Sequence, residues 1–299
     1  MDYYIIDLAF QGRAGAIAAF LVSGDEGHFL IECGPESTFK ALEAGLADHG
    51  VTPSELKGVF VTHIHLDHAG AAGKLAAQGV PIFVHPKGTR HLVDPERLVE
   101  SAKMVYGEKF EPLWGGMTPA QADLVHPVED GERVEVAGLT IEAIETPGHA
   151  FHHHSFAIGD TCFAGDAAGA AIGNSGFLSV TSAPPQFHLE HTLASIDKLA
   201  ERHFSTLYLT HFGAIEDPDE HLDAYREAVE LNVEFVRMRL EEKMESEALQ
   251  VAYEAFNLEQ AFRFSMPPAN WETLQSVNGT GMCADGIRLY WEKRFAAES

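Results

Sequence analysis

The stretch VTHIHLDHAG (61–70) constrains this chain more than any other part of its sequence. His63, His65, Asp67 and His68 follow at once on the apolar run GVFV, which is typical of a buried β-strand. Because residues two apart on an extended chain project to the same side, His63 and His65 can bind one ion together. Asp67 and His68 follow in an expected loop and can turn towards a second ion. Imidazole and carboxylate ligands suit zinc and similar metals.

Three isolated residues further along the chain also follow predicted strands. His149 comes behind Pro147-Gly148, Asp166 follows the strand predicted at 161–164, and His211 ends the strand predicted at 205–211. A single His or Asp in such a place is more often a cap or a surface residue. Strand ends can converge on one edge of a sheet, so we expect all the candidates to meet there. The set of metal-ligand candidates is His63, His65, Asp67, His68, His149, Asp166 and His211.

The order of these motifs resembles that of the metallo-β-lactamase superfamily over about residues 15–215. The motifs are HxHxDH (63–68), PGH (147–149), GD (165–166) and TH (210–211). The resemblance implies an α/β fold, namely an αββα sandwich, with a dinuclear metal centre. It also implies that His63, His65 and His149 hold one ion, that Asp67, His68 and His211 hold the other, and that Asp166 bridges both.

Individual residues and segments indicate which branch of this superfamily the chain resembles most. True β-lactamases usually lack the bridging acid that Asp166 would supply, and flavodiiron proteins usually have Glu where this chain has His65. The segments TPGHAFHHHSF and PPQFHLEHTLASIDKL are similar to glyoxalase-II-like hydrolases. In that branch His153 matches a repeated histidine, and one of His152, His153 and His154 can support a metal ligand from behind.

Short strands and helices alternate up to about residue 216. We expect strands at 3–6, 16–22, 29–32, 57–63, 81–85 and 205–211, and hairpins over 132–146 and 154–166. We expect helices at 37–50 (with Ser37 as the N-cap), 70–78, 95–106 and 189–203. The irregular segment 105–125, together with Met104, Trp114 and Met117, belongs either to the core or to a mobile flap over the metals.

The chain after residue 216 shows only helical periodicity. Its apolar positions are Leu222, Tyr225, Val229, Val233, Val236 and Leu240. We therefore divide the chain into an αββα domain (1–216) and a C-terminal α-helical extension (217–299). The apolar stripe must be covered either by the body of the chain or by a second copy, so a homo-oligomer through these helices stays open.

Composition limits the partners of this protein. A formal net charge of −25 disfavours nucleic acid and anionic membranes, so we expect a small-molecule substrate. No apolar run approaches a membrane span, and the N-terminus lacks the basic region of a signal peptide, so we expect a cytoplasmic protein. Cys33, Cys162 and Cys283 are widely spaced, and we expect buried, inert thiols.

These observations predict a metal-dependent hydrolase that uses two divalent ions, with zinc favoured and iron or manganese as alternatives. We expect a metal-bridging hydroxide to attack the carbonyl of a thioester, lactone or carboxylic ester, with Asp67 orienting the nucleophile and accepting its proton. Two alternatives remain open at this point. One is an iron-dependent redox enzyme with persulfide or oxygen chemistry, and the other is a non-catalytic metal-binding module whose helices recruit a partner.

Overall fold

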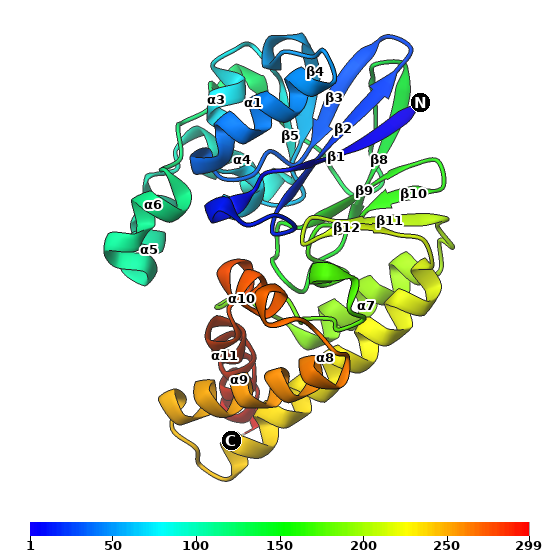
Figure 1. Ribbon diagram of the computed structural model, residues 1–299. Coiled ribbons are helices and arrows are strands. Elements are labelled where there is room, and N and C mark those ends of the chain that lie inside the picture. The colour runs from blue at the N-terminus through cyan, green and yellow to red at the C-terminus, as the bar shows by residue number, and fades with distance from the viewer. Residues whose placement is uncertain (299) are drawn as a thin grey trace.

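The structure, a computed structural model that describes residues 1–298, is an αββα sandwich with a C-terminal group of helices (Figure 1). The first sheet has the strand order β1-β2-β3-β4-β5-β6, with bounds Asp2–Asp7, Ala18–Gly24, Gly27–Ile31, Leu56–Phe60, Ile82–Val84 and Val125–Pro127. The second has the order β12-β11-β10-β9-β8-β7. In chain order, β7 to β12 span Arg133–Val136, Leu139–Glu145, His154–Ile158, Thr161–Phe163, Thr206–Leu209 and Gly213–Ile215.

Strand direction decides where the candidate residues meet. Strands β3, β4, β5 and β6 are parallel, so their carboxyl ends lie at the same edge of the first sheet. In the second sheet β10 and β11 are also parallel to each other. The segments that follow β4, β10 and β11 contain six of the seven predicted ligands, and this explains how segments distant in sequence reach one place.

The space between the two sheets is filled mainly by aromatic side chains. Phe60 of the first sheet lies 5.4 Å, ring centre to ring centre, from Phe156 of the second, and Phe20 lies 5.2 Å from Phe163. Alternation along β2 produces this packing, because Phe20 belongs to the inner core whereas its neighbour Leu21 belongs to the outer one. The result is a rigid base behind the strand ends.

Helices cover the outer face of each sheet. On the first sheet these are α1 Phe39–Asp48, α2 Leu66–Ala69, α3 Ala72–Ala76 and α4 Thr89–Val93. On the second they are α7 Leu189–Ala200 and α8 Pro218–Glu241. Short 3-10 turns occur at Phe10–Gly12, Glu36–Thr38, Pro53–Glu55, Pro86–Gly88, Gly107–Lys109, Ala122–Leu124 and Ile172–Asn174.

Two groups of helices extend beyond the sandwich. Helices α5 Glu96–Tyr106 and α6 Phe110–Trp114 project from one side of the body, and α5 has no buried residue in its described range (Figure 1). Helices α9 Ser246–Arg263 and α11 Thr280–Glu298 pack against α8, and α10 Pro268–Val277 contacts the turn Ile172–Asn174. The apolar stripe of α8 from Leu222 to Val236 is buried within this one chain, so it needs no second copy to cover it. Within residues 1–298, no helix is both long enough and apolar enough to pass through a membrane.

Most predicted elements are present, and both hairpins turn where expected, at Ala137-Gly138 and Gly159-Asp160. The prediction for Ser37 was wrong. Helix α1 begins at Phe39, and Ser37 lies in the preceding 3-10 turn, where its hydroxyl donates to the Leu113 carbonyl at 2.6 Å. A tertiary contact with α6 therefore replaces the expected cap.

Four further details differ from the predicted layout. Strand β4 ends at Phe60 and does not reach His63, and Asp67 and His68 lie on the short helix α2 rather than in a loop. The irregular segment contains α6, with Trp114 buried, whereas Met104 is 81% exposed. Strands β6 and β12 were not predicted because three residues show too little periodicity. The three cysteines are buried and free, as expected.

Candidate metal centre

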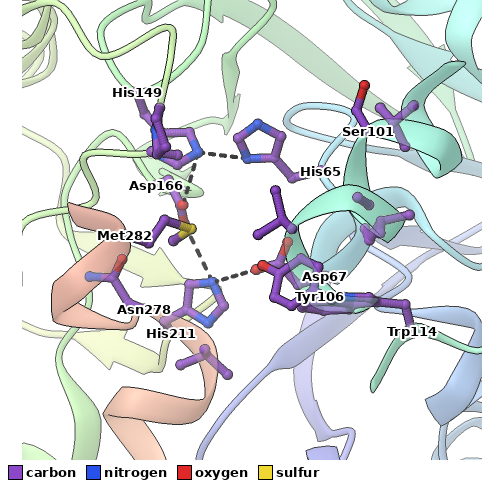
Figure 2. A pocket seen from close by; sticks show the side chains of 17 residues that line it. His65, Asp67, Ser101, Tyr106, Trp114, His149, Asp166, His211, Asn278 and Met282 are labelled. Atoms are coloured by element: carbon purple, nitrogen blue, oxygen red, sulfur yellow. Dashed lines mark hydrogen bonds and ion pairs between the residues drawn. The ribbon is translucent and has the colours of Figure 1, made fainter. Parts of the chain in front are cut away.

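The seven predicted ligands come together at the strand ends, and five of them line a cavity (Figure 2). Three sets of side chains place one candidate ligand atom each within 4.8 Å of the others. The sets are His63, His65 and His149; His63, His68 and Asp166; and Asp67, His68 and His211. The side chains are therefore arranged as the two-ion prediction requires, while the function of each residue as a ligand stays a prediction.

Asp166 lies between the two halves of this cluster. Its Oδ2 is 3.3 Å from His149 Nε2, whereas its Oδ1 is 3.5 Å from His68 Nε2 and 3.6 Å from His211 Nε2. This carboxylate presents one oxygen to His149 and the other to His68 and His211, which is the placement expected of a bridging ligand.

Asp67 belongs to the second half of the cluster. Its Oδ2 lies 3.3 Å from His211 Nε2 and 3.7 Å from His68 Nε2. Burial on its own would raise the pKa of Asp67, but His68 and the hydrogen bond with His211 hold this pKa well below its usual value. Asp67 is therefore a carboxylate over the whole physiological pH range.

Backbone carbonyls fix the orientation of two of the imidazoles. His149 Nδ1 lies 2.9 Å from the carbonyl oxygen of Thr181, and His211 Nδ1 lies 2.9 Å from that of Ala16. A carbonyl oxygen only accepts hydrogen bonds, so in each ring Nδ1 carries a proton and Nε2 is the nitrogen directed into the cluster.

Several atoms of the cluster are buried and have no hydrogen-bond partner. They include His63 Nε2, His68 Nε2 and Asp166 Oδ1. Unsatisfied polar atoms in a folded interior are costly, and the two predicted cations together would satisfy all three. Nitrogen and oxygen donors in this number fit two divalent ions of the zinc type.

The imidazoles differ in their readiness to bind a metal. Burial, reinforced by the neighbouring imidazoles, lowers the pKa of His63 and of His65 well below the usual value, so both are neutral and free to coordinate. Burial alone would lower the pKa of His68 as well. The negative charges of Glu32, Asp67 and Asp166 outweigh burial and raise the pKa of His68 to about 10. An ion that binds His68 must therefore displace a proton.

Sequence reasoning did not single out Glu32, which lies directly behind His68. It is completely buried, and its Oε1 lies 2.8 Å from His68 Nδ1. The same oxygen accepts hydrogen bonds from the hydroxyls of Thr62, at 2.6 Å, and Thr210, at 3.2 Å. Glu32 thus ties the segments after β3, β4 and β11 together and orients His68 from behind. The available signal was an acid at the end of a buried strand, the same signal that identified Asp166.

His153 supports the loop that carries Asp166. Its Nε2 accepts a hydrogen bond from the Asp166 N–H at 3.1 Å, and its Nδ1 lies 2.9 Å from the Thr146 hydroxyl. Gly165 makes this contact possible, because a Cβ there would lie 2.7 Å from His153 Nε2 and its φ of +54° suits glycine. His152 and His154 are also buried, but neither belongs to the three sets.

The cavity above the cluster has a volume of about 240 Å³. One wall consists of side chains from α5 and α6, and the other includes residues of the C-terminal region such as Val277 and Met282. Tyr106 projects into it close to Asp67 (Figure 2). The C-terminal helices, which the resemblance did not cover, therefore help to form the site.

Known proteins resemble this chain in sequence and in structure. A metallo-beta-lactamase fold-containing protein of Sulfurisphaera tokodaii is 26% identical over 215 residues, which cover 68% of this chain and 81% of that protein. A hydroxyacylglutathione hydrolase of Aliivibrio salmonicida is 27% identical over 190 residues, 62% of each chain. The crystal structure of a metallo-beta-lactamase family protein from Thermus thermophilus superposes with a TM-score of 0.68 and 22% identity, covering 98% of this chain and 94% of that one.

The family model of the metallo-beta-lactamase superfamily matches residues 12–211, which contain every residue of the three ligand sets. With the two-sheet architecture and the clustered histidines and aspartates, this match settles the classification. The chain belongs to the metallo-beta-lactamase superfamily.

Proposed function

We propose that this protein is a metal-dependent hydrolase that cleaves a small-molecule ester-like bond, namely that of a thioester, lactone or carboxylic ester. The observation that carries the proposal is the position of Asp166 between two sets of ligand atoms at the base of a cavity. The superfamily includes metal-dependent hydrolases, and relatives named hydroxyacylglutathione hydrolases share part of the sequence.

Two divalent ions held by the predicted ligands would supply Lewis acidity and lower the pKa of a water molecule towards neutrality. The protein contributes the remaining elements. Asp67 is ionised and can accept a proton from the attacking water at Oδ2. Glu32 keeps His68 in place, and His153 holds the backbone of Asp166.

Tyr106 provides a neutral hydrogen-bond donor in the cavity. Burial, with a smaller contribution from the charge of Asp67, raises the pKa of Tyr106 to about 12, so its hydroxyl stays protonated at physiological pH. In the proposed reaction this O–H binds an oxygen of the substrate and orients the scissile bond.

The test is a panel of a carboxylic ester, a thioester and a lactone, assayed with zinc-loaded protein. We expect hydrolysis of at least one compound, and a large loss of kcat in Asp67→Asn, which keeps the size of the side chain but removes the base. If the wild-type protein hydrolyses none of these compounds faster than the Asp67→Asn variant does, the hydrolase proposal is wrong.

A further inference from the structure

Helix α5 presents an apolar stripe to the cavity. Leu98, Ser101, Ala102, Val105 and Tyr106 all line it, and their spacing of three, four, seven and eight residues places them on one face of a helix. A helix normally buries such a face completely against protein. Here no residue of α5 is fully buried: Leu98, Ala102 and Tyr106 are half-buried and pack against the neighbouring core, whereas Val105 is 72% exposed. Part of the stripe therefore remains open to the cavity above the candidate metal centre.

The wall of the cavity opposite α5 also offers few free polar groups. Ala183, Pro184, Val277 and Met282 are apolar or nearly so. The amide of Asn278 is already engaged, because its Nδ2 donates to Ser179 Oγ at 2.9 Å and to the Val180 carbonyl at 3.1 Å, and its Oδ1 accepts from Cys283 Sγ at 3.0 Å. This wall therefore also suits an apolar group.

Positive charge is missing from the cavity walls. None of the described residues that line the cavity is Lys or Arg, whereas Asp67 and Asp166 are among them. The lysine on α5, Lys103, lies 3.8 Å from Glu111 and over the ring of Phe110, and it is not part of the lining. A substrate with carboxylates remote from the scissile bond would find no counter-charge on the protein.

From this lining we infer the substrate class: an uncharged ester, thioester or lactone whose aliphatic acyl chain lies along α5, rather than an anionic conjugate such as a glutathione thioester. This inference rests on the proposed hydrolase function and adds to it a preference for uncharged substrates with an aliphatic acyl chain. Covering the α5 stripe with the acyl chain removes apolar surface from water on both partners, which favours longer chains.

The first test compares p-nitrophenyl esters of acetate, butanoate and hexanoate with the mono-p-nitrophenyl ester of adipate. The adipoyl group has the same six carbons as the hexanoyl group but ends in a carboxylate. We expect kcat/KM to rise by up to about fourfold for each added methylene that is buried. We expect the adipoyl ester to be cleaved at least about tenfold less efficiently than the hexanoyl ester, because its carboxylate meets no cation.

A matched pair of variants locates the effect on α5. Val105→Lys places a cation on the cavity wall, whereas Met104→Lys places the same cation on the adjacent residue, which is exposed and does not line the cavity. We expect Val105→Lys to raise the adipoyl-to-hexanoyl ratio of kcat/KM by about twofold to fivefold. Met104→Lys should leave this ratio unchanged. Both positions are on the surface, so both variants should fold, which circular dichroism will check.

The outcomes separate the two proposals. Hydrolysis of the esters without a preference for hexanoyl over adipoyl, or equal ratios in the two lysine variants, would overturn the substrate class and leave the hydrolase function standing. Absence of hydrolysis for all esters, together with thioesters and lactones, would overturn the hydrolase function and the substrate class with it.

Discussion

Asp166 connects the two halves of the candidate metal centre through a single carboxylate. Replacing it with Asn removes the charge and one of the two oxygens, so one half must lose its contact. We predict that Asp166→Asn loses preferentially the ion predicted at Asp67, His68 and His211, while the fold survives. Elemental analysis of protein loaded with excess zinc and then desalted should fall from two ions per chain towards one.

Asp160→Asn is the matched control, since Asp160 lies exposed in the turn between β9 and β10 and should retain both ions. An Asp166→Asn protein that keeps two ions and full hydrolytic activity would show that the bridge is placed wrongly. A wild-type protein that binds only one ion when saturated would contradict the dinuclear prediction itself.

Glu32 acts on the metals through His68 and touches neither ion in the predicted arrangement. Glu32→Gln keeps the shape but removes the negative charge that holds the proton on His68 Nδ1. We predict metal affinity about 10–100-fold weaker than in the wild type, the usual loss when such a supporting group is removed. Competition with a fluorescent chelator measures this. Glu254→Gln on the exposed face of α9 is the control, and equal affinities in all three proteins would contradict the role of Glu32.

At the scale of elements, patterns with a clear period could be predicted and isolated contacts could not. The hairpin over 132–146 was predictable because it alternates apolar and polar residues around a turn, and the hairpin over 154–166 because Gly159-Asp160 marks a turn between two short strands. The ligand segments were predictable because His and Asp follow buried strands. The position of Ser37 was not, since its hydrogen bond to Leu113 joins residues 76 apart in sequence.

The shape of the cavity could not be predicted either, because it also depends on contacts between residues that are distant in sequence. Its walls bring α5 together with residues from 277 to 282, and no local pattern links these two segments. The burial of Glu32 likewise depends on hydroxyls of Thr62 and Thr210, which reach it only after both sheets have formed. The sequence therefore predicted which histidines and aspartates gather at the strand ends, whereas the shape of the cavity and the support behind these side chains required the folded chain.

Helix α8 is more than an outer cover of the second sheet. The hydroxyl of Tyr225 lies 3.1 Å from that of Thr181, which in turn donates to the Asp166 carbonyl at 2.7 Å. The apolar side chains of α8 pack against Ile196 and Leu199 of α7. The C-terminal helices thus contact the loop that carries the predicted bridging residue.

We predict that a chain ending at residue 216 is poorly soluble, or retains metal while losing most of its activity. Removing the extension exposes the apolar face of α7 and deletes the cavity wall around Val277 and Met282. Sedimentation, metal content and ester hydrolysis of the shortened chain test this. A soluble and fully active shortened chain would show that the C-terminal helices are dispensable.

At the scale of the whole molecule, buried neutral histidines make the fold sensitive to acid. His154 is fully buried, and burial, with a smaller effect of His85, lowers its pKa to about 3. The unfolded chain takes up a proton on this residue below about pH 6.5, whereas the folded chain does not until about pH 3. Its contribution to stability is therefore present above pH 6.5 and is lost progressively as the pH falls towards 3.

We predict that His154→Leu reduces the stability lost between pH 7 and pH 5 by about 2 kcal/mol relative to wild type. Urea unfolding of chelator-treated protein at both pH values measures the difference and keeps metal release out of the comparison. An equal loss in the two proteins would mean that His154 is already protonated in the folded state at pH 5.

The overall arrangement of the site also separates a hydrolase from a redox enzyme of the same fold. Zinc has no redox chemistry, whereas an oxygenase needs iron with an open coordination position. His68, His211 and Asp67 complete a second set of ligand atoms beside the first, and a mononuclear iron enzyme has no need of that set. We therefore predict that zinc-loaded protein hydrolyses an ester, thioester or lactone without oxygen, and that its rate falls in acid as the histidine ligands and the attacking hydroxide take up protons. The measurement compares zinc-loaded with iron-loaded protein, each with and without oxygen. Activity confined to the iron form and dependent on oxygen would establish the redox alternative, even with all seven side chains bound to metal.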